Sequence, residues 1–169
     1  RFVRLGFFHI LEGTDHLLFL LCLVPLGSGQ FWRRPVFMRL LLTITAFTAA
    51  HSLTLIASAY DMAPTALWFP PLVETLIALS IVVMALENIV GTFSFERRWA
   101  LAFGFGLIHG FGFSFALRDA LQFAGSHHLS ALLAFNVGVE LGQLLVLVLL
   151  LPLLGLLFRY VVAERMGTI

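Results

Sequence analysis

Histidines and carboxylates lie inside stretches of this sequence that are otherwise apolar. The first such stretch contains His9, Glu12, Asp15 and His16. On a continuous helix, with a rotation of about 100° per residue, these four side chains would share an arc of roughly 120°. Imidazole and carboxylate donors without thiolates suit divalent nickel, cobalt, zinc, iron or manganese. The pattern therefore predicts a divalent-metal site on one face of this helix.

The later apolar stretches also carry isolated polar side chains. In chain order these are His51, Glu74, His109, Asn136, Glu140 and Gln143. Counted inward from the outer helix ends at about 1.5 Å per residue, these residues, Gln143 apart, lie at a common depth of roughly 6–16 Å, as do those of the first stretch. An acidic residue at mid-bilayer costs about 2.5–3.5 kcal/mol, and neither lysine nor arginine is expected at that depth. The carboxylates therefore need protonation, hydrogen bonds from histidine or a bound cation.

Composition indicates the environment of these residues. Of 169 residues, 60% are hydrophobic and only 11% are charged, with a mean hydropathy of +1.02. This charge is too scarce to cover a water-facing surface. The net charge of +1 is uninformative, and because the sequence has no basic stripe, we expect no nucleic-acid partner. A single cysteine, Cys22, excludes an internal disulfide and a multi-thiolate metal site.

Polar or helix-breaking segments divide the chain into apolar runs of membrane-spanning length. We expect an all-α integral membrane protein, a bundle of about five transmembrane helices (alternatively six) in a single domain over residues 1–169. The expected spans are about 5–26, 38–60, 70–91, 98–117 and 129–158. The positive-inside rule places the N-terminus outside and the C-terminus inside, because arginines gather in the first and third loops and in the tail. The lipid bilayer is therefore an expected partner.

Five ordered motifs resemble the HupE/UreJ family of membrane proteins. They occupy residues 9–19 (HILEGTDHLLF), 47–54, 73–80, 105–113 and 135–143, and they cover nearly the whole chain. The resemblance implies a nickel or cobalt permease of a bacterial inner (cytoplasmic) membrane. It also implies a subgroup in which an extracytoplasmic region precedes the membrane domain, which agrees with an outward N-terminus and a chain that opens on Arg1. The oligomeric state stays open, and an oligomer is one alternative.

The leading interpretation is a nickel or cobalt transporter with a metal site in the outer half of the bilayer. Its expected ligands are His9, Asp15, His16, His51, His109 and Glu140, with Glu12, Glu74, Asn136 and Gln143 as additional candidates. The alternative is a membrane-embedded metalloenzyme, a zinc or dinuclear hydrolase with Glu74, Glu140 or Asp15 as general base. A metal-binding accessory subunit is a third interpretation. The competing role of His9, Asp15 and His16 is an interhelical hydrogen-bond cluster that only locks packing. His51 and His109 could each be a satisfied core histidine, and Glu12 could simply be solvated.

Overall fold

The computed structural model describes residues 1–25, 33–91, 94–121 and 128–158, with the backbone alone for residues 115–121. These ranges form helices with short connecting segments and contain no strand. The helices are α1 (Phe2–Glu12), α2 (Thr14–Leu23), α3 (Arg34–Ala59), α4 (Phe69–Val90), α5 (Phe95–Leu121) and α6 (His128–Leu157). Proline occupies the first turns of α3 and α4, where its missing N–H has no intrahelical partner to lose. Gly91 ends α4 in the left-handed conformation, with φ of 68°.

Three of these helices, α3, α4 and α6, are long and apolar enough to cross a membrane. The count rises to four if α1 and α2 form one bent span. This supports the expected all-α, membrane-spanning architecture. The boundaries of α3, α4, α5 and α6 agree with the expected spans to within four residues.

The expectation of one continuous first helix over residues 5–26 is wrong. The chain bends by 72° between α1 and α2, and Gly13 has an extended backbone (φ −80°, ψ 100°) at the break. Glycine is the poorest helix former after proline, and Asp15 in the first turn of α2 favours a new helix start there. The predicted arc shared by His9, Glu12, Asp15 and His16 therefore does not exist, because these residues lie on two helices.

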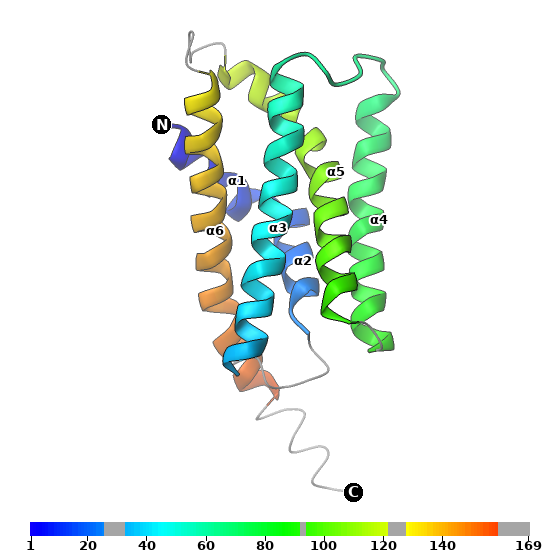
Figure 1. The fold of residues 1–169 in the computed structure, drawn as a ribbon, viewed down its shortest axis with the longest axis vertical. Helices are drawn as coiled ribbons and strands as arrows, with labels where there is room; N and C mark the ends of the chain where they lie inside the picture. The colour runs from blue at the N-terminus through cyan, green and yellow to red at the C-terminus, as the bar shows by residue number, and fades with distance from the viewer. Residues whose placement is uncertain (26–32, 92–93, 122–127, 159–169) are drawn as a thin grey trace, which may run out of the picture.

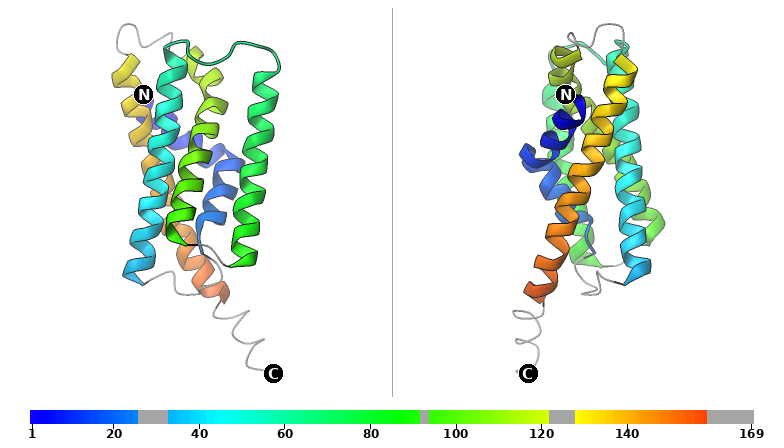
Figure 2. Two further views of the ribbon diagram at one scale, coloured as in Figure 1. Left: turned by 45° about the vertical axis from the view of Figure 1, so that its right-hand side comes forward. Right: turned by 90° about the vertical axis from the view of Figure 1, so that its left-hand side faces the viewer.

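Helices α3, α4, α5 and α6 run roughly parallel, while α1 slopes across the bundle and α2 turns to run along it (Figures 1 and 2). The closest helix pairs are α3 with α5 and α1 with α6. Glycines make both approaches possible, because a Cβ at Gly6 of α1 would overlap the backbone of Phe135 in α6, and one at Gly106 of α5 would overlap the backbone of Phe47 in α3. Small residues of this kind let membrane helices pack backbone to backbone.

Candidate metal centre

The break at Gly13 brings the end of α1 and the start of α2 against each other. The ring centroids of His9 and His16 lie 4.4 Å apart. A Cβ on residue 13 would lie 2.7 Å from Nδ1 of His16 and 2.8 Å from the carbonyl oxygen of His9. Glycine is therefore required here for space, and the tight turn places both histidines in one cluster.

Asp15, His16 and His109 form the centre of this cluster. One ligand atom from each residue lies within 4.8 Å of the other two, and Oδ1 of Asp15 lies 3.3 Å from Nδ1 of His16. A transition metal with ligand bonds of about 2.0–2.2 Å holds its donors no more than about 4.4 Å apart. A shift of a few tenths of an ångström would thus let all three donors bind one ion.

Two further histidines lie beside this group. The ring of His51, from α3, is 5.9 Å from that of His9 and 6.1 Å from that of His16. The rings of His16 and His109 are 5.3 Å apart. Four helices, α1, α2, α3 and α5, therefore each direct one imidazole into the same part of the interior.

Most of the ring nitrogens in this cluster are buried without a hydrogen-bond partner among the described residues. They include Nε2 of His9, Nε2 of His16, both nitrogens of His51 and Nδ1 of His109. A buried polar atom left unsatisfied costs about 1–3 kcal/mol. Several such atoms in one place indicate a site that is completed by something other than these side chains, and imidazole nitrogens next to a carboxylate suit a metal ion.

Ser80 of α4 determines which nitrogen His109 offers. The Ser80 hydroxyl donates to the carbonyl oxygen of Ile77 at 2.6 Å, and its Oγ lies 3.0 Å from Nε2 of His109. Because the hydroxyl proton is already used, Oγ accepts a hydrogen bond from Nε2–H. His109 therefore carries its proton on Nε2 and keeps the Nδ1 lone pair for the cluster. The outer hydrogen bond of a ligating histidine generally fixes the tautomer in this way.

We expect Ser80→Ala to weaken metal binding about 10–100-fold, the range for losing such an outer hydrogen bond. The metal affinity of the purified protein would be measured by calorimetry. Ser114→Ala is the matched control, because Ser114 is also buried but donates to Phe111 of its own helix at 2.7 Å. An equal affinity in both variants would contradict the role of Ser80 as the residue that orients His109.

Aromatic rings enclose the cluster. The ring of Phe113 lies 3.8 Å from that of His9, and the rings of Phe19 and Phe47 each lie 5.1 Å from that of His109. Such walls keep water away from the imidazoles and strengthen the attraction between a cation and Asp15.

Glu140 and Gln143 lie outside the central group and link α6 to α3. Thr45 donates to Oε1 of Glu140 at 3.0 Å, and Thr48 donates to Oε1 of Gln143 at 2.7 Å. The same helix carries Asn136, whose buried Oδ1 has no hydrogen-bond partner among the described residues. These contacts between α3 and α6 fit a role in helix packing as well as they fit metal ligation.

The structure separates the remaining candidates, Glu74 and Glu12, from the buried imidazoles. Glu74 is exposed and shares a shallow cavity of about 290 Å³ with Asp15, between α2 and α4. Glu12 is exposed beside Arg1 and Arg4, around a different cavity of about 680 Å³. Of the two, only Glu74 borders the same space as a member of the central group.

A second buried polar network joins the C-terminal ends of α2 and α4 to the N-terminal end of α5. Arg98 donates to the carbonyl oxygen of Cys22 at 2.9 Å and to Oδ1 of Asn88 at 3.1 Å. Its Nε lies 3.5 Å from Oε2 of Glu87, whose side chain is only 3% exposed. These interactions fix the C-terminal end of α2 against α4 and α5.

Sequence reasoning assigned no role to Ser80 or to the enclosing phenylalanines. A serine in an apolar helix usually bonds its own backbone, and Ser80 does so. Only the packing of α4 against α5 reveals its second partner, so the sequence offered no signal for it beyond its place in the third motif.

Comparison with known proteins agrees with the resemblance seen in the motifs. A family model described as HupE / UreJ protein matches residues 1–169, the whole chain. Neither the curated proteins nor the solved structures contain a match. The apolar helices and the family together indicate a multi-pass membrane protein. With its metal-compatible Asp15, His16 and His109 group, the chain belongs to the HupE / UreJ family.

Proposed function

We propose that the protein carries a divalent transition-metal ion, nickel(II) or cobalt(II), across the membrane as its substrate. The observation that carries this proposal is the convergence of four imidazoles and Asp15 at a break in a membrane helix. Asp15, His16 and His109 would form the central ligand group, with His9 and His51 as neighbouring ligands. Glu140 and Glu74 remain candidates for a transient contact with the ion.

The broken helix supports transport over a purely structural role. Secondary transporters commonly build ion sites at discontinuous membrane helices, where helix ends and free polar groups meet near the middle of the bundle. The end of α1 contributes the negative pole of its helix dipole to the cluster, which favours a cation. Asp15 offsets the positive pole at the start of α2. Together these features make the break a place where a cation is stabilised.

The spacing of the histidines suits a moving ion. His9 and His51 lie close enough to His16 for an ion to exchange one imidazole for another without losing all its ligands. His51 lies eight residues, about 12 Å, from the end of α3. With that end outside, as the arginine pattern predicts, the cluster would load from the outer side.

Release on the other side requires a rearrangement of the Glu87–Arg98 network. This network lies at the C-terminal end of α2, and the packed rings of Phe19 and Phe47, 4.9 Å apart, lie between it and the cluster. We therefore interpret this conformation as one that is closed toward the inner side. Alternating access would involve a movement of α2 relative to α4 and α5.

Reconstituted protein is expected to take up labelled nickel into proteoliposomes. Uptake should saturate with nickel concentration and should be reduced by excess cobalt, because both ions suit the same imidazole and carboxylate donors. Protein-free liposomes provide the background. Uptake no greater than that background, from protein that binds nickel in solution, would contradict the transport proposal.

One observation favours a membrane-embedded metallohydrolase as the second candidate. Asp15, at the edge of the cluster, borders the same cavity as Glu74, so an ion bound there would be near a free carboxylate. A metal-bound water with a neighbouring general base is the arrangement that hydrolysis needs. Tightly held stoichiometric zinc, without nickel uptake, would favour this candidate or a metal-binding accessory subunit.

A further inference from the structure

A cavity unrelated to the metal centre lies where α2 ends and α3 and α5 begin. It has a volume of about 210 Å³, far more than the 10–15 Å³ that a single water needs. Its lining residues are Leu23, Pro25, Val36, Arg39, Leu40, Thr43, Phe95 and Arg98. The lining thus combines two guanidinium groups with a mostly apolar wall.

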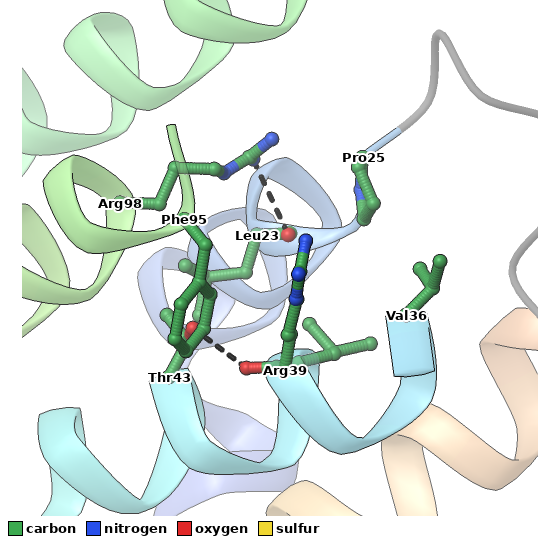
Figure 3. Close-up of a pocket in the computed structure, with 8 residues that line it drawn as sticks. Leu23, Pro25, Val36, Arg39, Thr43, Phe95 and Arg98 are labelled. Carbon is green, nitrogen blue, oxygen red and sulfur yellow. Dashed lines mark hydrogen bonds between the residues drawn. The ribbon is translucent and has the colours of Figure 1, made fainter. Parts of the chain in front are cut away.

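The two arginines reach this cavity from different helices. Figure 3 shows Arg39 extending from α3 and Arg98 extending from α5, both toward the end of α2 near Leu23. Arg98 donates through Nη2 to the carbonyl oxygens at the end of α2, and Glu87 balances its charge.

Arg39, in contrast, has no acidic partner among the residues that the structure describes. Its guanidinium lies 5.6 Å from the centre of the Phe95 ring, and it forms neither a hydrogen bond nor an ion pair within the described ranges. A guanidinium presents five N–H donors in a fork that matches the oxygens of a phosphate. Arg39 is therefore a cation with its hydrogen-bonding capacity unused, at the edge of a cavity.

The surroundings of the cavity are basic and border lipid. Five described arginines gather at this end of the bundle: Arg33, Arg34, Arg39, Arg97 and Arg98. On the same helix as Arg39, Met38 and Leu42 are 48% and 52% exposed, which is expected of side chains that face acyl chains. Basic pockets between membrane helices at the bilayer surface commonly bind anionic lipid headgroups.

We propose that this cavity binds the phosphate of an anionic phospholipid, with Arg39 as the principal contact. The unpaired guanidinium would hold the phosphate oxygens, while the apolar wall of Leu40, Val36 and Phe95 accommodates the glycerol and the first acyl carbons. A free phosphate ion would gain nothing from that wall. A bound lipid would join α2, α3 and α5 at this end of the bundle.

Native mass spectrometry of the full chain tests the proposal, with phosphatidylglycerol and phosphatidylcholine as the two added lipids. We expect wild-type protein to retain phosphatidylglycerol in preference to phosphatidylcholine. Arg39→Gln should weaken retention of phosphatidylglycerol at least about fivefold, the effect of one basic residue near an anionic lipid. Arg34→Gln is the matched control, because Arg34 is an exposed arginine of the same helix that does not line the cavity.

Three results would overturn the proposal. The first is unchanged retention in Arg39→Gln. The second is an equal loss in Arg34→Gln and Arg39→Gln, which would mean general attraction to the basic end of the bundle. The third is displacement of the lipid by inorganic phosphate, which would mean that the ion alone is recognised. Circular dichroism of each variant would show that the helices are intact.

Discussion

Replacing His16 with alanine is expected to abolish metal binding, and Asp15→Asn is expected to do the same. His16 and Asp15 supply two of the three donor groups that lie within 4.8 Å of one another. Loss of an outer hydrogen bond to a ligand costs about 10–100-fold in metal affinity, and loss of the ligand itself should cost more. The dissociation constant should therefore rise by more than about 100-fold, or about 2.8 kcal/mol.

Thermal unfolding with and without nickel measures this loss. A ligand at about 100 times its dissociation constant stabilises the folded state by about 2.7 kcal/mol. Wild-type protein should therefore unfold at a higher temperature when nickel is present, while both variants should show no change. Metal analysis of the purified proteins provides the stoichiometry.

Two substitutions control for the general loss of a histidine or a carboxylate. His128 is exposed at the start of α6, and Glu12 is exposed one residue before the break. His128→Ala and Glu12→Gln should keep the metal content and the stabilisation by nickel. Full metal content in both His16→Ala and Asp15→Asn would show that the assigned site is wrong.

The sequence predicted the helices well because their signals are local. Apolar runs, proline at the first turns and Gly91 at the end of α4 determine where α3, α4 and α6 begin and end. The break at Gly13 was missed because both sides of it are apolar and helical, so a hydropathy pattern continues across it. The combination of Gly13, Thr14 and Asp15 was the available sign of a new helix start.

The candidate site could be predicted only in part, because its geometry depends on how the helices pack. Residue type and depth selected His9, Asp15, His16, His51 and His109, and the structure places these five close together. The same reasoning could not separate Glu12 from them, since it assumed a continuous helix. It also could not tell that Glu140 and Gln143 would be engaged by threonines of α3.

Gly110→Ala is expected to destabilise the folded protein by about 1–3 kcal/mol, the range for forcing extra volume into a packed core. A Cβ at Gly110 would overlap the hydroxyl of Thr54 and crowd the carbonyl of His51. Helices α3 and α5 would have to separate along their most extensive contact. Because Gly110 follows His109, this separation would also move His109 away from His51 and weaken metal binding.

Gly104→Ala on the same helix should have the opposite effect, because a Cβ there meets nothing within 4 Å. Alanine is favoured over glycine within a helix by about 0.8–1.0 kcal/mol, so this variant should be as stable as wild type or more stable. Thermal unfolding in detergent compares the two, with nickel affinity as the second readout. The two substitutions, six residues apart on one helix, should change the stability in opposite directions because different atoms face the two glycines. Equal stability of both variants would contradict the close α3–α5 approach that positions His51 against His109.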